Sequence, residues 1–204
     1  MTLTYINYHL NTHEKCVKYL EEKRWKGIPI CPYCGCNKSS PKKLRYTCLK
    51  CKNSYSVTVG TVLENSNLPL YKWLMAITLI LAAKKGISAM QLSRDLTVNK
   101  NTAWLLQMKI RGAMKEGKID LFIKRKNRSR SAQQKSLDAD FSRKNAFGYW
   151  TMLKRAIIGQ YHKIDTYYLS RYTDEIEFKF NRKHLIDRGY DDLLQQLLFL
   201  GIAK

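Results

Sequence analysis

The chain has 204 residues, and its content of 45% hydrophobic and 11% aromatic residues excludes a wholly disordered protein. Lys and Arg number 37 against 16 Asp and Glu, which gives a net charge of +21. A small soluble domain needs a net charge of only about 2–8 in magnitude, so the excess predicts a polyanionic partner. Nucleic acid is the leading candidate, because Lys and Arg that neutralise phosphates release counterions. A generically basic, ribosome-associated or heparin-like binder is the alternative.

The sequence shows neither a secretory signal nor a membrane-spanning run. Residues 1–20 lack an apolar core, and charged residues occur from Glu14 onward. The most apolar run, residues 73–83, is shorter than the roughly 20 residues that span a bilayer. We therefore expect a cytoplasmic, nucleoid-associated protein with no membrane partner. In such a protein the six cysteines are expected to be metal ligands or core thiols rather than disulfides.

The hydrophobic periodicity predicts a mainly helical fold with one small β region. Helical patterning occupies residues 2–26, 70–85, 89–96, 99–115, 148–158, 166–180 and 191–200. Residues 54–59 alternate polar and apolar side chains, as a half-buried strand does, and residues 44–47 offer a partner strand. A basic run at residues 124–130, followed by polar residues, is typical of a linker or mobile arm.

Two pairs of cysteines have the spacing of a zinc ribbon. Cys31 and Cys34 form one C-x-x-C knuckle, Cys48 and Cys51 form the other, and thirteen residues separate the knuckles. Each knuckle turns tightly enough for both thiolates to reach one ion, and the hairpin between them would complete a tetrahedral four-sulfur site. Such a closed site leaves no position for water, so the predicted cofactor is a structural zinc ion. Cys36 is interpreted as a spare thiol.

Residues 88–115 have the proportions of a helix-turn-helix, with a short helix, a turn and a longer helix. Ser88 and Gln91 fit a capping box at the start of the first helix, and Asn99 is a suitable N-cap for the second. In this motif the first residues of the second helix face base edges, and basic residues beyond them reach phosphates. The predicted DNA contacts are therefore Lys100, Asn101, Thr102, Gln107, Lys109 and Arg111. The alternative is an ordinary helical hairpin with solvated polar side chains.

Beyond the cysteines, a series of short motifs follows in a characteristic order. In the N-terminal half they are GTVLE at 60–64, LPLYKW at 68–73, KGISA at 85–89, QLSR at 91–94 and TAW at 102–104. In the C-terminal half they are YW at 149–150, LKR at 153–155, IGQYH at 158–162, YTDE at 172–175 and FKFNR at 178–182. Together these motifs resemble the bacterial insertion-sequence transposases related to the eukaryotic Merlin transposons. That group joins a zinc ribbon and a helix-turn-helix to a ribonuclease-H-like domain.

The resemblance implies transposon-end DNA as the ancestral ligand and a mechanism in which three carboxylates hold two divalent metal ions. The sequence departs from the family pattern where those carboxylates should lie. Only residues 118–147 separate the N-terminal motifs from the C-terminal motifs. No run within them has the pattern of the strands that carry the carboxylates in the family. Phe147 stands at the position matching the third carboxylate; Asp120 is interpreted as a relic of the first, and Asp138 and Asp140 match no motif. We therefore assign no catalytic residue.

The predicted fold class is mainly α with a small β zinc ribbon. Its predicted parts are an N-terminal helical segment (1–28), a zinc ribbon (29–66), a helix-turn-helix domain (67–117), a basic linker (118–145) and a truncated remnant of the transposase catalytic domain (146–204). The apolar residues of that remnant would form a new core or a dimer interface; they are Trp150, Leu153, Ile157, Tyr172, Phe178 and Phe180.

The predicted function is that of a transposase-derived protein that recognises double-stranded transposon-end DNA and does not cut it. One alternative is an active insertion-sequence transposase that uses divalent metal ions for strand cleavage and transfer. The other is an RNA- or ribosome-binding zinc protein. A homodimer, or a mixed complex with an intact transposase, is the further partner that we expect.

Overall fold

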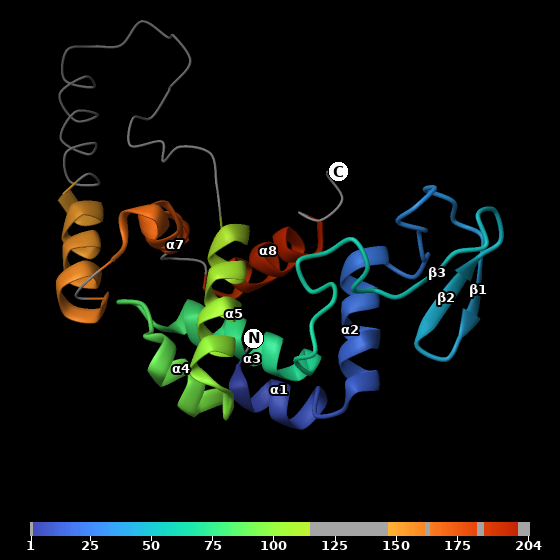
Figure 1. Cartoon of the computed structure of the whole chain (residues 1–204), viewed down its shortest axis with the longest axis horizontal. Coiled ribbons are helices and arrows are strands. Elements are labelled where there is room, and N and C mark those ends of the chain that lie inside the picture. Colours follow the sequence, from blue (N-terminus) through green and yellow to red (C-terminus); the bar gives the residue numbers. More distant parts are fainter. Residues whose placement is uncertain (1, 115–146, 162–163, 183–185, 200–204) are drawn as a thin grey trace, which may run out of the picture.

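The computed structural model of the protein describes residues 2–114, 147–161, 164–182 and 186–199, and their fold is mainly helical with one small sheet (Figure 1). The helices are α1 (Leu3–His9), α2 (His13–Trp25), α3 (Leu70–Ala82), α4 (Ala89–Leu96), α5 (Lys100–Ala113), α7 (Leu169–Asn181) and α8 (Ile186–Phe199). The strands are β1 (Ser39–Lys42), β2 (Arg45–Cys48) and β3 (Ser54–Tyr55). Residues 147–156 are helical and continue into a π-helical turn, η1 (Ile157–Tyr161), and a 3₁₀ turn, η2 (Thr166–Tyr168), leads into α7. The predicted fold class is confirmed.

The N-terminal segment forms two helices where one was predicted. α1 is capped by the Thr2 hydroxyl, which accepts a hydrogen bond from the Tyr5 amide, and it ends at Leu10, whose amide donates to Ile6. Asn11 and Thr12, both poor helix formers, separate it from α2. The break lets α1 and α2 both pack against α3, so that Leu10 is buried along with Ile6.

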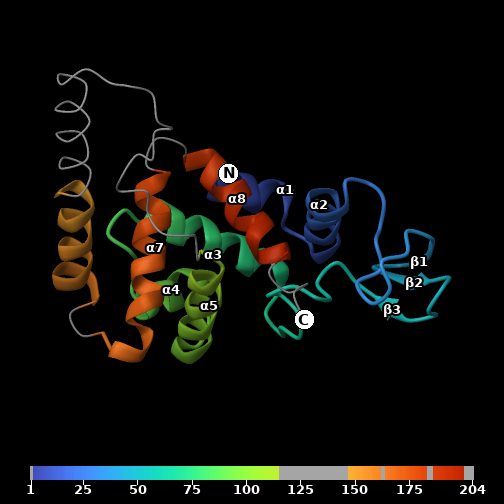
Figure 2. The same cartoon turned by 90° about the horizontal axis from the view of Figure 1, so that it is seen from above.

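α3 lies at the centre of the main core, and α1, α2, α4, α5 and α8 all pack against it (Figures 1 and 2). Its apolar residues are buried nearly all round, as the sequence pattern predicted. α8 completes this core with four fully buried leucines, which are Leu193, Leu194, Leu197 and Leu198. The Val62 amide also donates a 3.2 Å hydrogen bond to the carbonyl oxygen of Leu197. The C-terminal helices therefore share one core with the N-terminal half.

A second, smaller cluster joins helix 147–161 to α7. It contains Tyr149, Leu153 and Ala156 from the first helix and Ile176 from α7. The predicted apolar set of the C-terminal part thus divides: Phe178 is buried in the main core, Leu153 lies in the small cluster, and Trp150 remains 63% exposed. Among the described helices, none is both long enough and apolar enough to span a bilayer.

The three strands form an antiparallel sheet in the order β1-β2-β3, at the end of the molecule opposite helix 147–161 (Figures 1 and 2). β2 and β3 pair as predicted, with Tyr46 opposite Tyr55, but β3 is shorter than the predicted strand at 54–59. The cause is Arg24 of α2, whose buried guanidinium donates to the carbonyl oxygens of Val57 at 2.5 Å and Val59 at 2.8 Å. These carbonyls face α2 and are therefore unavailable to a sheet partner.

Candidate metal centre and nucleic-acid interface

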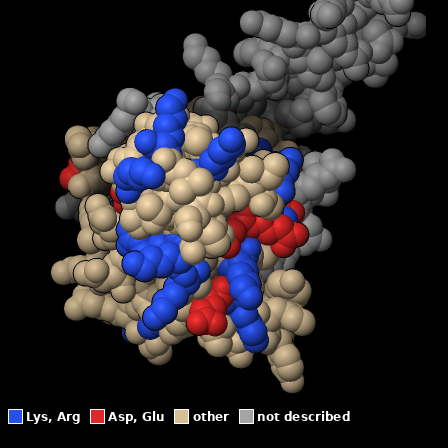
Figure 3. Space-filling model, turned by 90° about the vertical axis from the view of Figure 1, so that its right-hand side faces the viewer, with Lys and Arg blue, Asp and Glu red and all other residues tan. Residues whose placement is uncertain are grey.

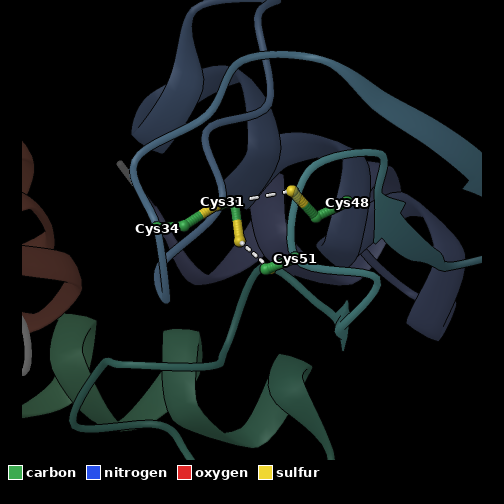
Figure 4. A group of neighbouring side chains, drawn as sticks. All are labelled: Cys31, Cys34, Cys48 and Cys51. Atoms are coloured by element: carbon green, nitrogen blue, oxygen red, sulfur yellow. Dashed lines mark hydrogen bonds between the residues drawn. The ribbon is translucent and has the colours of Figure 1, made fainter.

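The four predicted cysteine ligands come together in one cluster between the two knuckles of the ribbon (Figure 4). Their sulfur atoms all lie within 4.8 Å of one another, with Cys31 and Cys51 3.7 Å apart and Cys34 and Cys48 3.5 Å apart. Zn–S bonds of about 2.3 Å at tetrahedral angles place neighbouring sulfurs about 3.8 Å apart, so the cluster has the dimensions of a ZnS₄ site. The donor set and geometry fit a structural zinc ion, and the protein binds zinc in this way.

The local backbone shapes each half of this site. The Gly35 amide donates to the Cys31 carbonyl, the Lys52 amide donates to the Cys48 carbonyl, and Gly35 and Lys52 both have positive φ. Each knuckle is therefore a tight turn that points its two sulfurs inward. β1 and β2 then bring the two knuckles together.

The thiols do not ionise equally. The backbone amide of Cys51, and to a smaller extent that of Lys50, lowers the pKa of Cys48 to about 6, against the desolvation that raises it. The pKa of Cys34 rises to about 12, because desolvation and its three thiol neighbours outweigh the amide of Cys36. The Cys48 thiolate thus forms readily, whereas the Cys34 thiolate needs a bound cation to stabilise it. Cys36 lies outside the four-sulfur group and its sulfur accepts from the Lys38 amide, which fits a spare thiol.

The ribbon presents a basic surface at its end of the molecule (Figure 3). Its exposed basic residues are Lys38, Lys42, Lys43, Arg45, Lys50 and Lys52.

A cluster of aromatic rings joins the ribbon to α2. The ring of Trp25 lies 5.4 Å from that of Tyr46 and 5.8 Å from that of Tyr55, edge to face in both cases. The metal centre is thereby attached to the helical body.

α4 and α5 form a helix–turn–helix pair, close to the bounds predicted for it. The Ser88 hydroxyl accepts from the Gln91 amide at 3.2 Å, and the Asn99 side chain accepts from the Asn101 amide at 2.9 Å. In a complete capping box the Gln91 side chain would also accept a hydrogen bond from the Ser88 amide. Here the Gln91 side chain donates to Asp95 instead. Thr97 makes the turn in the left-handed conformation.

The predicted DNA contacts separate into an accessible group and a buried group. Lys100, Asn101 and Lys109 are exposed on α5, and Thr102 is half-buried. Gln107 is only 2% exposed and donates to the Ile87 carbonyl. This contact holds the loop that precedes α4, so the prediction that Gln107 reads a base is corrected.

Arg111 was also predicted as a DNA contact, and this too is corrected, because the side chain is 1% exposed. Its Nε donates to Glu175 of α7 at 2.6 Å, and its guanidinium lies 4.1 Å from the ring centre of Tyr172. Lys179 donates to the other oxygen of Glu175 and, at 2.9 Å, to the Ala83 carbonyl. Tyr161 donates to Glu175 at 3.2 Å. This group, which we call the α5–α7 cluster, ties the end of α5 to the C-terminal helices.

Opposite charges decide the protonation state of the α5–α7 cluster. Burial alone would raise the pKa of the Glu175 carboxyl, but Lys179 and Arg111 hold it below its ordinary value. The carboxylate is therefore ionised and neutralised inside the protein. It is an internal counter-ion, with both oxygens already occupied by protein donors.

Three residues that the sequence analysis did not single out complete the surface around α5. Leu105 is 55% exposed and lies one turn from both Asn101 and Lys109. Lys72 of α3 reaches the helix–turn–helix turn, where its Nζ donates to the Thr97 carbonyl at 3.1 Å. The exposed Arg171 of α7 donates to the Met108 carbonyl at 2.7 Å, beside the C-terminal half of α5. The i, i+4, i+8 spacing of 101, 105 and 109 is a sequence signal that would have found Leu105.

The fold and these sites define a class of protein: a helical protein that contains a structural zinc ribbon and a helix–turn–helix pair. Two models of protein families match the chain. A model described as a transposase zinc-ribbon domain matches residues 11–54, and one described as an ISXO2-like transposase domain matches residues 119–181. Both matches are to domains of insertion-sequence transposases, and they support that family for this chain. No curated protein and no solved structure gives a significant match.

The second match contains the residues on which the catalytic question depends. Asp120, Asp138, Asp140 and the basic run at 124–130 lie outside the residues that the structure describes. Within the described ranges, the one group of three or more metal-binding side chains is that of the four cysteines. Phe147, at the position predicted to match a family carboxylate, is 75% exposed on an apolar helix face.

Proposed function

We propose that this transposase-derived protein binds double-stranded DNA through α5, with transposon ends as its ligand, and does not cut it. The observation that carries the proposal is the exposed stripe on α5, formed by Asn101, Leu105 and Lys109. The opposite side of the same helix is buried, with Ala103 and Ile110 inaccessible to solvent. α5 therefore presents one free face from a fixed position, as a recognition helix must.

The dimensions and charges of this face suit a DNA groove. α5 has 14 residues, which corresponds to a length of about 21 Å, and a single helix fits the major groove of B-DNA. Basic side chains lie on either side of the exposed stripe, with Lys72 and Lys100 at the N-terminal end and Arg171 beside the C-terminal half. These positions favour phosphate contacts that would orient α5 in the groove.

Loss of strand cleavage is the second part of the proposal, and it rests on the carboxylates. A two-metal phosphoryl-transfer site needs several acidic side chains that converge on the ions. Phe147 offers no ligand atom, and the most deeply buried described carboxylate, Glu175, is neutralised by Arg111 and Lys179. The segment from Asp120 to Phe147 lies inside the range 119–181 that matches the transposase domain, and we interpret it as a shortened form of the catalytic domain.

We place a contact with a second copy, or with an intact transposase, on helix 147–161. Phe147, Trp150 and Ile158 are exposed there around an apolar depression of about 430 Å³. Exposed apolar patches of this kind are typical of protein–protein contacts. A remnant that dimerises in this way would inhibit intact transposase through mixed complexes. Co-expression that leaves transposition frequency unchanged would contradict the inhibitory role.

The test of the main proposal is a binding and cleavage assay with one labelled transposon-end duplex. Zinc-loaded protein is titrated over a range of salt, with Mg²⁺ or Mn²⁺ present, and strand nicking is scored in the same samples. We expect salt-sensitive, sequence-selective binding without nicking. Metal-dependent nicking that disappears in Asp120→Asn, Asp138→Asn or Asp140→Asn variants would instead establish the active-transposase alternative. Stronger binding to a structured RNA than to the duplex would favour the RNA-binding alternative.

A further inference from the structure

Leu105 is the one large apolar side chain exposed in the middle of the free face of α5. Its helical neighbours on that face, Asn101 and Lys109, are polar and charged, and Leu105 belongs to neither hydrophobic cluster of the described residues. Trp104, the nearest large ring in the sequence, is half-buried and packs edge-on against Tyr168 at 5.3 Å. Leu105 therefore stands alone as an apolar group where the helix would meet DNA.

The major groove offers one kind of apolar group at the base edges, the C5 methyl of thymine. A leucine side chain directed at base edges gains by covering that methyl and gains nothing at the same position of a G·C pair. We infer that Leu105 is a specificity-determining residue that contacts a thymine methyl in the recognised site. This inference rests on the proposed DNA binding by α5.

The neighbour one turn earlier restricts the site further. Asn101 is exposed, and an asparagine side chain is suited to bidentate hydrogen bonds with the N6 and N7 atoms of adenine. Residues four apart on a helix are separated by about 6 Å along its axis, close to the rise of two base pairs at about 3.4 Å each. Asn101 and Leu105 thus read an adenine and a thymine within about two base-pair steps of each other.

The charged surroundings support DNA as the occupant of this face. The stripe is flanked by Lys72, Lys100 and Arg171, and the chain carries a net charge of +21. An isolated exposed leucine surrounded by cations would be an unsuitable contact for an acidic protein surface, whose carboxylates would have to lose water beside it. In a DNA groove the phosphates remain at the edges and the thymine methyl lies inside.

The experiment removes the methyl group without changing any hydrogen bond. The probe is a short duplex enriched by the full-length, zinc-loaded protein from a random-sequence pool, and its thymines are replaced one at a time by deoxyuridine. We expect one replacement to weaken binding of the unmodified protein about three- to fourfold, the effect of leaving one apolar carbon group uncovered. Leu105→Ala should bind the thymine duplex more weakly and lose the discrimination between thymine and deoxyuridine. Leu105→Met should retain it.

Met90→Ala is the matched control, because Met90 is an exposed apolar residue of α4 outside the stripe. It should leave both affinity and discrimination unchanged. Circular dichroism of each variant establishes that the helices are intact, as expected for an exposed position filled by good helix formers. Insensitivity of the unmodified protein to every replacement, or full discrimination by Leu105→Ala, would overturn the inference while DNA binding stands. A pool from which no duplex is enriched would overturn the proposed function itself.

Discussion

The most direct test of how this fold is held together is the substitution Glu175→Gln. Glu175 is the anion of the α5–α7 cluster, where two cations, Arg111 and Lys179, donate to its two oxygens. All three side chains are at most 8% exposed. The substitution keeps the size and one acceptor oxygen of the side chain but removes the charge. It leaves two buried cations facing a neutral amide, and Nη1 of Arg111 already lacks a hydrogen-bond partner among the residues that the structure describes.

The size of the effect follows from burial. Breaking a buried ion pair by removing one partner costs about 3–5 kcal/mol, because the remaining charge is left without compensation. For a chain of this length each kcal/mol shifts the melting temperature by about 2–4 °C, so a decrease of about 6–20 °C is expected. Asp191→Asn is the matched control, since its 2.9 Å pair with Lys23 is largely exposed. A pair of that kind contributes about 1 kcal/mol at most.

The assay is thermal unfolding of the zinc-loaded protein, followed by far-ultraviolet circular dichroism, for both variants. A third variant that combines Arg111→Met, Glu175→Leu and Lys179→Met separates the charge effect from a packing effect. These apolar replacements should recover most of the lost stability, because none of the three charges of the cluster remains buried. A melting temperature for Glu175→Gln within about 1 °C of the Asp191→Asn value would refute the reasoning. So would a combined variant that is less stable than Glu175→Gln.

The same cluster makes the free energy of unfolding depend on pH, because the pKa of Glu175 is lower in the folded state than its ordinary value of 4.5. The stabilisation by the Glu175 carboxylate is therefore fully present above pH 4.5. It is lost as the pH falls through the lower pKa of the folded state. Denaturant titrations at a series of acidic pH values should show this loss in the unmodified protein and not in Glu175→Gln. Cys48→Ser should abolish the stoichiometric zinc detected by elemental analysis and unfold the ribbon, since metal binding supplies its folding free energy. Leu193→Ala should lower the free energy of unfolding by about 2–5 kcal/mol, because its side chain is fully buried, and denaturant titration will measure the change. Lys100→Ala should weaken DNA binding similarly across sequences and reduce the salt slope by about 1, whereas Lys15→Ala on α2 should leave both unchanged.

Local signals in the sequence predicted the zinc site and the helix–turn–helix pair well. The spacing of the four cysteines determines the geometry of the site, because two C-x-x-C turns joined by a hairpin allow few arrangements of the sulfur atoms. Ser88 and Asn99 cap α4 and α5, as their side chains indicated, because capping depends on atoms only two or three residues away. These features needed no knowledge of the tertiary structure.

The predictions for Gln107 and Arg111 were wrong for different reasons. Gln107 is four residues after Ala103 and three before Ile110, so helical geometry alone placed it on the inner face. Arg111 could not be placed in this way, because its burial depends on Glu175, 64 positions away in the sequence. Local periodicity contains no information about such a partner. The shortened β3 is similar, since Arg24 on another element takes the carbonyls that would have extended it.

The position of the C-terminal helices explains why a DNA-binding remnant would keep them. α8 covers α3 with four buried leucines, and the Glu175 carboxylate of α7 neutralises Arg111 at the end of α5. A chain that ended after α5 would expose the apolar side of α3 and leave Arg111 buried without an anion, or force it into water. The helix proposed to read DNA would then lose the support that fixes its free face. Under the proposed function, α7 and α8 are needed for DNA recognition because they support α5, whereas the carboxylates of a catalytic centre are not. Selection for the proposed DNA binding would therefore favour retention of α7 and α8.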